Sequence, residues 1–568
     1  MPEPDVMWSF TREARIAYFS MEIGLAPEIP TYSGGLGMLA GDAVRSAADL
    51  DIPMVAVTLV SRAGYFRQLL TANGEQQESP DTWDPATHAV PLSARTCVAI
   101  EGRTVWLTGW LYLAECVRGT HVPVILIDTD LPENTPEDRQ LTHYLYGGDN
   151  RYRLKQELLL GVGGVRLLAT LGLKLRHYHM NEGHAALLTL ELLRRTALAE
   201  RDVRTGESTY DIPRVRELCT FTTHTPVEAG HDCFDYSLVA SVVGFLIDES
   251  TLRTLGGQEQ LDLTRLALNM SQYVNGVAES HAETSRHLYP NYPIHAITNG
   301  VHAATWTSRA FAELFDRHVP RWRHEPEMLI RAQCCLTDDA VWSAHGQAKT
   351  ELLVEIAKLG VRLDPSRPIL CFARRMTTYK RPDLLFADLE RLRALARQWP
   401  FQLVLAGKAH PQDKPGKELI RSVHEHLRAL SPEVQSVYVP NYDMRIAKLL
   451  VAGADVWLNT PQPPMEASGT SGMKAAFNGV PSLSVLDGWW LEGHIEGITG
   501  WAIGDGGRHE FQADAASLYE KLGHIVLPTY YNDRRAWIAI MKGAIAKCAS
   551  VFNSHRMMRR YAVDAYLH

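Results

Sequence analysis

Short apolar runs alternate with longer amphipathic stretches along most of the chain. The short runs of the first half are rich in β-branched and aromatic residues, which predicts strands. They lie at residues 15–21, 53–60, 121–130, 217–224 and 295–301. Between them, apolar residues recur every three or four positions, which predicts amphipathic helices. These helices lie at residues 38–50, 153–172 and 184–197.

The same alternation restarts at Pro368 and continues through the second half of the chain. Strands are predicted at residues 368–375, 401–408, 434–442 and 455–460, and helices at residues 381–398 and 444–454. Strands that are apolar on both faces and separated by helices are typical of parallel sheets covered on both sides. Two such series predict an α/β protein with two doubly wound, Rossmann-like domains that face an interdomain cleft.

The chain has 568 residues, more than one hydrophobic core normally supports. We place the first domain at residues 1–304 and the second at 305–546, with connecting helices at about 305–364. A final helix within residues 547–568 is expected to pack back on the first domain.

Composition excludes several classes of partner. The formal net charge is −8, so neither nucleic acid nor an anionic membrane is expected as a partner. No apolar run approaches the ~20 residues of a membrane-spanning helix. None of the eight cysteines forms a CxxC pair, so we expect no zinc site and no disulfide framework. The first residues, MPEPDVMWSF, lack the pattern of a signal peptide, and a cytoplasmic location is therefore expected.

Ligands of doubly wound folds bind at the carboxyl ends of the strands, so polar residues there are candidate site residues. The segment TYSGGLGMLAGD follows the first predicted strand and opens a helix. Its glycines Gly34, Gly35 and Gly37 allow close approach of backbone N–H groups to a ligand, and the helix dipole favours an anion. A plain turn is the alternative interpretation.

The segment CFARRMTTYKRP follows the first predicted strand of the second half. It places Arg374, Arg375, Lys380 and Arg381 within eight residues. Cations at a helix N-terminus are unfavourable unless an anion lies nearby, so the segment predicts an anion site. A solvated basic helix start is the alternative.

Other polar residues also follow predicted strands or precede predicted helices. A single histidine is most often structural, but a position at a strand end favours function. These candidates are Asn181, Glu182, His184, His224, Lys408, Tyr442 and Arg445. The stretch YVNGVAESHAETSR is interpreted as a buried helix with Ser280 and His281 facing the cleft.

The stretch MEASGTSGMKAAFNGV combines Glu466, a glycine-rich turn and Lys474 at the start of a helix. A lysine is disfavoured there unless something negative faces it. Gly469 to Gly472 offer a nest of N–H groups that fits a phosphate. Lys474 then serves either as a phosphate counter-ion or as the attachment point of an aldehyde cofactor, and the residues alone leave both open.

Together these segments resemble the α-glucan (glycogen, maltodextrin) phosphorylases of the short prokaryotic type. EASGTSGMKAAFNG resembles the pyridoxal-phosphate signature of that family, and ARRMTTYKR resembles its phosphate-binding segment. SGGLG, THT, VNGVAESH, TNGV and NYDMRIAKLLVAGAD match further segments in family order, from about Arg15 to about Glu492.

The resemblance implies a GT-B type fold and a PLP-dependent glycosyltransferase. The implied reaction is retaining phosphorolysis of the non-reducing-end glucosyl unit of an α-1,4-glucan by inorganic phosphate, giving glucose 1-phosphate. The implied cofactor is pyridoxal 5'-phosphate, no metal is expected, and a homodimer is possible.

The resemblance also assigns roles to residues. Lys474 would be the Schiff-base lysine, and Glu466 is expected to project into the cleft beside the cofactor. The implied contacts of the cofactor are Arg374, Thr470, Ser471, Tyr442 and Gly35, and those of the substrate phosphate are Arg375 and Lys380. The implied contacts of the glucosyl unit are Glu466, Ser468, His224 and Asn299, with Gly469 also in the substrate site, and the Gly35 N–H would lie near both the cofactor phosphate and the substrate phosphate. Two positions depart from the larger family members: Thr377 replaces a histidine, and Gly24 stands where a second aromatic residue contacts the cofactor ring.

Two other functions compete with this one. A nucleotide-sugar glucosyltransferase, such as a glycogen or starch synthase, has the same fold but usually carries a lysine where this chain has Ser33. Such enzymes also commonly place two glutamates eight apart, where this chain has Glu466 and Lys474. A non-catalytic glucan-binding protein is the second alternative, and the intact cationic positions argue against it.

Overall fold

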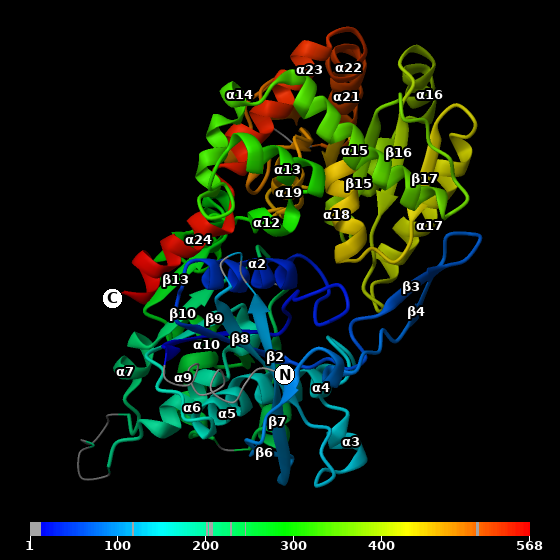
Figure 1. Ribbon diagram of the computed structural model, residues 1–568. Helices are drawn as coiled ribbons and strands as arrows, with labels where there is room; N and C mark the ends of the chain where they lie inside the picture. Colours follow the sequence, from blue (N-terminus) through cyan, green and yellow to red (C-terminus); the bar gives the residue numbers. More distant parts are fainter. Residues whose placement is uncertain are drawn as a thin grey trace.

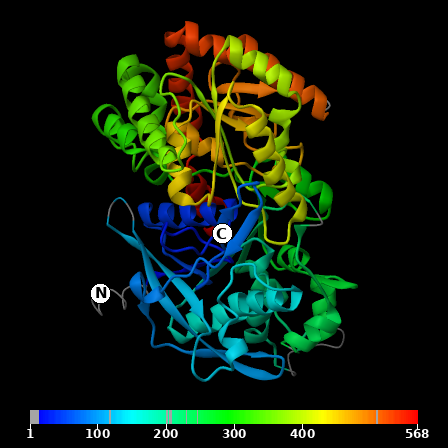
Figure 2. The same ribbon diagram turned by 90° about the vertical axis from the view of Figure 1, so that its right-hand side faces the viewer.

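The computed structural model describes residues 13–567 except 116, 118, 200–202, 204–207, 228–229, 245 and 507–509. The segment MPEPDVMWSF lies outside the described residues. Two α/β units lie one above the other (Figures 1 and 2), each built on its own sheet. Within the described residues, no helix is both long and apolar enough to cross a membrane.

The first unit contains a ten-stranded sheet. Its parallel strands run in the order β8-β2-β1-β9-β10-β13-β14, and antiparallel β7 extends the sheet beyond β8. In chain order this is 3-2-1-4-5-6-7, as expected for a doubly wound sheet. Their bounds are β1 Ile16–Ser20, β2 Met54–Leu59, β8 His121–Asp128, β9 His177–Asn181, β10 Cys219–Thr222, β13 Tyr273–Gly276 and β14 Ile294–Ala296, with β7 at Arg103–Glu115.

Four of the five strands predicted in this half are present, and the fifth, predicted at residues 295–301, coincides with β14 only at residues 295–296. Of the strands just named, the sequence pattern missed β7, β9 and β13. Strand β9 has the sequence HYHMN. Its polar side chains His179 and Asn181 are buried, because they form hydrogen bonds with residues of neighbouring strands. The predicted helix over 273–286 is wrong in its first turn, because Tyr273–Gly276 is a strand and helix α11 begins only at Glu279. Asn275 is buried in that strand and bonds Thr222 and Tyr561, which a short sequence window cannot show.

The second unit contains six parallel strands in the order β17-β16-β15-β18-β19-β20. This is again the 3-2-1-4-5-6 order, and the four predicted strands are confirmed. The strand bounds are β15 Ile369–Ala373, β16 Gln402–Ala406, β17 Gln435–Val439, β18 Val456–Asn459, β19 Ser482–Val485 and β20 Gly500–Ile503. The main helices beside them are α16 Leu389–Gln398, α17 Lys414–Ala429 and α18 Met444–Gly453.

Several short helices connect the units, and the last one returns to the first unit. Helices α12 Ala303–Trp306, α13 Arg309–His318 and α15 Asp338–Ala357 lie in the connection. Helix α24, Ser554–Tyr561, packs on helix α2, Gly35–Asp49 (Figure 1), and the Ser46 and Ser554 hydroxyls are 2.6 Å apart. The domain limits at 304 and 546 remain a prediction.

A hairpin of the first unit reaches the second (Figure 1). It consists of β3 Arg67–Leu70 and β4 Gln76–Ser79. The side-chain amide of Gln68 donates to the Gly407 carbonyl at 2.8 Å, and Lys408 Nζ donates to the Phe66 carbonyl at 2.8 Å. The hairpin therefore ties the strand-end loop of β16 to the first unit, and Lys408 is occupied in that contact.

Candidate active site

A cluster of buried cations lies where β15 ends. The Arg374 NH2 group donates to Glu466 Oε2 at 2.7 Å, and Lys380 Nζ contacts the same oxygen at 2.5 Å. All three side chains are buried. Burial opposes ionisation of Glu466, but Arg374 and Lys380 hold its pKa below the ordinary value. Glu466 is therefore an ionised carboxylate paired with both cations, and its projection into the cleft beside the cofactor remains a prediction.

Arg374 still has unused hydrogen-bonding capacity. Its Nε and NH1 groups are buried and have no partner among the described residues. Two cations share one carboxylate, so the cluster carries a net positive charge. Buried guanidinium donors are normally satisfied, which makes this position suited to an anion. Tyr442 lies near Arg374: burial raises the pKa of its hydroxyl, and the Arg374 charge partly opposes that rise.

Lys474 lies on helix α19, Ser471–Ala476, which starts after Thr470. Its Nζ is 3.8 Å from the centroid of the Trp306 ring, and Trp306 in turn donates to Asp42 Oδ2 at 2.8 Å. Burial lowers the pKa of Lys474 to about 8, against the opposing charge of Asp42. About a tenth of this amine is therefore uncharged at pH 7, far more than for an ordinary lysine, and an uncharged amine is what nucleophilic attack requires.

The predicted phosphate cradle at the start of α19 consists of backbone N–H groups and remains a prediction, while the side chains around it differ in their partners. Ser471 Oγ accepts a hydrogen bond from Trp457 Nε1 at 3.0 Å. Ser468 Oγ, by contrast, is buried and has no partner among the described residues. Gly469 has φ of +83°, a conformation that a side chain would strain, so the turn depends on glycine at this position.

Asp487 was not predicted but is part of this site. It accepts hydrogen bonds from the backbone N–H of Glu466 and of Gly488, each at 2.9 Å. Burial, together with the adjacent Glu466 charge, raises the pKa of Asp487 to about 7. The residue lies just past the end of β19, so the signal in the sequence was a carboxylate at a strand end. It was overlooked because β19 itself was not predicted.

The glycine loop faces the cation cluster from the first unit. A Cβ atom on Gly34 would lie 2.9 Å from Arg375 NH2, so glycine permits the approach of that guanidinium. A Cβ atom on Gly35 would meet no atom within 4 Å, so open space lies in front of this helix start. Arg375, unlike Arg374, remains exposed to solvent.

Glu22 holds the glycine loop and was also missed. Its Oε2 accepts hydrogen bonds from the backbone N–H of Ser33 at 2.5 Å and of Gly34 at 3.2 Å. Its Oε1 accepts one from the Tyr146 hydroxyl at 3.0 Å. Glu22 follows β1 by two residues, and strand-end position was again the available signal.

His224, after β10, joins two other predicted residues. Its Nε2 is 2.7 Å from Asn181 Oδ1, and its backbone N–H donates to Glu182 Oε2 at 2.9 Å. Burial lowers the pKa of His224 to about 4, although Glu182 opposes this. His224 is therefore neutral at pH 7. The Nε2 atom of the neighbouring His184 is directed to Arg153 and Asp232 instead.

Three further candidates fall in different surroundings. Asn299 is buried, and its Oδ1 has no partner among the described residues. Arg445 forms an ion pair with Glu355 at 2.9 Å, and Arg381 pairs with Asp514 at 2.7 Å. Both arginines therefore have an ion-pair partner, although NH1 of Arg381 is buried without a hydrogen bond among the described residues.

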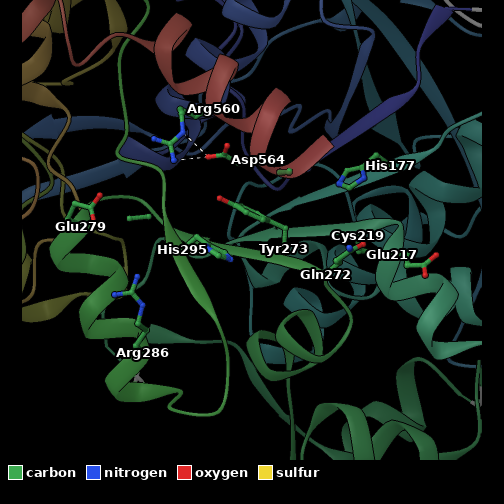
Figure 3. A pocket seen from close by; sticks show the side chains of 12 residues that line it. His177, Glu217, Cys219, Gln272, Tyr273, Glu279, Arg286, His295, Arg560 and Asp564 are labelled. Carbon is green, nitrogen blue, oxygen red and sulfur yellow. Dashed lines mark hydrogen bonds and ion pairs between the residues drawn. The ribbon is translucent and has the colours of Figure 1, made fainter. Parts of the chain in front are cut away.

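A groove of about 580 Å³ lies elsewhere, between the first unit and the end of the chain (Figure 3). The Tyr273 and His295 rings are stacked 4.7 Å apart in it, and Arg560 pairs with Asp564 on one wall. None of the predicted site residues lines this groove. The chemistry argued above therefore belongs to the strand ends between the units.

Comparison with known proteins gives consistent matches over nearly the whole chain. Residues 246–496 match the family model described as carbohydrate phosphorylase. Maltodextrin phosphorylase of Thermococcus litoralis is 38% identical over 99% of this chain and 72% of its own length. Glycogen phosphorylase of Mycobacterium tuberculosis H37Rv is 36% identical, covering 97% and 70% respectively. Glycogen phosphorylase of Aquifex aeolicus is 33% identical, covering 98% and 86%.

Proposed function

Since the chain belongs to the carbohydrate phosphorylase family, we propose that it is an α-1,4-glucan phosphorylase. It transfers the non-reducing-end glucosyl unit of a glycogen- or maltodextrin-like chain to inorganic phosphate, giving glucose 1-phosphate with retention. The observation that supports this best is the buried cation cluster, in which Arg374 keeps two unpartnered donors beside a carboxylate already shared with Lys380. Such a cluster is suited to phosphate chemistry.

The residues also fit pyridoxal 5'-phosphate, on which phosphorylases of this family generally depend. A buried amine with a lowered pKa at Lys474 suits attachment of an aldehyde, and the free donors of Arg374 suit a phosphate group. The other residues proposed to hold the cofactor are Thr470, Ser471, Tyr442 and Gly35. When bound, the cofactor would supply a phosphate acid beside the substrate phosphate.

The chain's own residues would position and neutralise the substrate phosphate. Two phosphate groups side by side repel each other, so both bind only where cations and N–H dipoles surround them. Arg375 and Lys380 approach from the second unit, and the N-terminus of helix α2 at Gly35 approaches from the first. Positive charge held in a buried site needs no reorganisation during the reaction, which favours the transition state.

Neutral polar groups would hold the sugar. If Nε2 of His224 donates to Asn181 Oδ1, its Nδ1 is left as an acceptor for a sugar hydroxyl. Asn299 Oδ1 and Ser468 Oγ are buried without partners, and sugar hydroxyls would satisfy both. Glu466 and Gly469 complete the proposed sugar site. Glu466 would then act on the sugar and on the two cations together.

The test is glucose 1-phosphate production from maltodextrin and inorganic phosphate, with cofactor absorbance read on the same preparation. We expect phosphate-dependent turnover and pyridoxal absorbance, both reduced in Arg374→Ala. Arg421→Ala is the matched control, because Arg421 is paired with Glu418 and Glu425 on the surface of α17. Glucan elongation from a nucleotide sugar without that absorbance would support a synthase instead. Glucan binding without turnover in either assay would support a non-catalytic binding protein.

A further inference from the structure

Three segments far apart in the sequence bring Asp49, His302 and His555 together. Asp49 is the last residue of α2, His302 caps α12, and His555 lies in the first turn of α24. Their exposed fractions are 4%, 3% and 0%. The Nε2 atoms of His302 and His555 lie 2.9 Å and 3.1 Å from Asp49 Oδ2. One potential ligand atom from each residue falls within 4.8 Å of the other two.

Hydrogen bonding accounts for only part of this cluster. Asp49 Oδ1 accepts from the Val117 backbone N–H at 2.8 Å, which leaves Oδ2 for the two histidines. Neither ring nitrogen of His555 makes a hydrogen bond of normal geometry within the described residues, although the ring is fully buried. In the part of the chain that the structure describes, the only polar contact of this buried imidazole is thus the 3.1 Å approach of Nε2 to Asp49 Oδ2, an oxygen that it shares with His302, and a group bound between the three residues would satisfy it better.

We propose that Asp49, His302 and His555 form a structural zinc site, bound through Asp49 Oδ2 and the Nε2 atoms of both histidines. Zinc bonds of about 2.0–2.1 Å in tetrahedral geometry place neighbouring ligand atoms roughly 3.3 Å apart. The two separations from Asp49 Oδ2, 2.9 Å and 3.1 Å, therefore need to open by only a few tenths of an ångström, while the ligand atoms of the two histidines lie within 4.8 Å of each other. Water would complete the coordination, since this set has three protein ligands.

The surroundings of His302 support this role. Its Nδ1 lies 2.7 Å from Thr305 Oγ1, a contact that fixes the orientation of the ring. In the structure Nδ1 accepts the Thr305 backbone N–H at 3.3 Å. On metal binding, Nε2 gives up its hydrogen bond to Asp49, and Nδ1 takes up the proton and donates to the threonine hydroxyl. The Thr305 N–H then keeps only its second acceptor, the His302 carbonyl at 3.2 Å. This is a change of tautomer within a neutral ring, and no net charge is moved. Metal-bound histidines usually carry such a second hydrogen bond.

A second buried cluster in the same chain provides the matched control. Asp455 contacts His345 Nε2 at 2.9 Å and Lys349 Nζ at 2.8 Å. The lysine ammonium has no lone pair and already supplies positive charge, so this cluster satisfies its carboxylate without a metal. Histidine in place of that lysine is what distinguishes the Asp49 cluster.

The site would fasten the end of the chain to the loop that carries Asn299. Arg556, next to His555, donates to the carbonyls of Thr298 and Asn299 at 2.8 Å and 2.9 Å. A metal at His302 and His555 would hold α12, α24 and α2 as one body. This inference is independent of the proposed reaction, because it concerns how the chain is held together.

The experiment uses the chain of 568 residues, stripped with a chelator, dialysed, and then loaded separately with Zn²⁺, Co²⁺ or Mg²⁺ and freed of excess metal. We expect one zinc per chain by elemental analysis, a rise of several degrees in melting temperature with Zn²⁺ but not Mg²⁺, and cobalt d–d absorption without a thiolate band. His555→Gln should lose all three responses, and His345→Gln should keep them.

Absence of stoichiometric zinc or cobalt binding by the wild-type protein would overturn the proposal without any variant. So would zinc binding that His555→Gln retains. A thiolate band would place the metal on cysteines, of which Cys334 is exposed, and would overturn it as well. If His555→Gln does not fold, His302→Gln provides the same comparison.

Discussion

Strand β1 of the first unit and strand β15 of the second occupy the same central place in sheets of the same strand order. Past the end of β1, the carboxylate of Glu22 is held by the N–H groups of its own glycine loop. Past the end of β15, Arg374 and Arg375 follow directly, and a carboxylate from another loop, Glu466, pairs with the first of them. With the same strand order, the first unit therefore presents a carboxylate that is already hydrogen-bonded to backbone N–H groups, whereas the second unit presents two arginines.

The ionisable groups follow the same division. In the first unit, burial keeps His224 neutral, with a pKa of about 4. In the second, Lys474 has a pKa of about 8 and Glu466 remains ionised between two cations. Strand order sets where a ligand binds, whereas the side chains at the strand ends determine which groups the ligand meets: mainly cations of the second unit for anions, and polar side chains of both units for the sugar hydroxyls.

The largest expected effect is from Lys474→Ala, which removes the proposed attachment point from the cationic half. We expect cofactor absorbance to disappear and phosphorolysis to fall roughly 10³-fold or more, about 4 kcal/mol in activation free energy. Borohydride reduction and peptide mapping of the wild-type protein should label Lys474. Lys408 is the internal control, since burial lowers its pKa to about 8 as well. A label on Lys408 instead would show that a lowered pKa, rather than the site, selects the lysine.

Next comes Arg375→Ala, which removes the exposed cation that faces the glycine loop. Loss of a charge-assisted contact to an anion in such a site is worth on the order of 2–4 kcal/mol. We expect a higher KM for phosphate and a lower kcat, with cofactor content unchanged, from initial rates at varied phosphate. An unchanged KM for phosphate would mean that Arg375 does not contact the substrate phosphate and that the two units do not enclose it at this residue.

Glu466→Gln tests whether the carboxylate serves the sugar or only its two cations. We expect kcat/KM to fall roughly 10²-fold, about 2.7 kcal/mol, with cofactor retained. Because Arg374 and Lys380 then lose their shared carboxylate, the melting temperature should also fall in buffer without phosphate and recover when phosphate is added. Joint loss of activity and cofactor absorbance would make Glu466 a structural residue of the cofactor pocket.

The smallest effect is expected from His224→Gln, read as stability against pH. The pKa of His224 is about 4 in the folded protein and ordinarily 6.5, so between these values the unfolded chain binds more protons. Its contribution to stability is thus present above pH 6.5 and lost as the pH falls toward 4. The variant should show a shallower fall in melting temperature over this range. His287→Gln, an exposed position on α11, should match the wild-type slope, and equal slopes in all three proteins would contradict the prediction.

Much of the fold followed from the sequence because it depends on local pattern. Apolar runs in the sequence located the hydrophobic strands. The polar residues that follow those strands identified Arg374, Lys380 and Lys474 as candidate site residues before any contact was known. Strand β9 could not be recognised this way, because His177 and His179 are buried through hydroxyl partners on other segments.

The sequence by itself determined the strand–helix order, the cationic strand ends and the family signature, since each is written in neighbouring residues. Only the tertiary structure decided which of those groups meet. It paired Glu466 with Arg374 across 92 positions and bound Lys408 to the first unit. It also gathered Asp49 and His302 across 253 positions, with His555 beside them. Electrostatic attraction and burial act through space, and the spacing of two residues along the chain does not specify their distance once sheets and helices have packed.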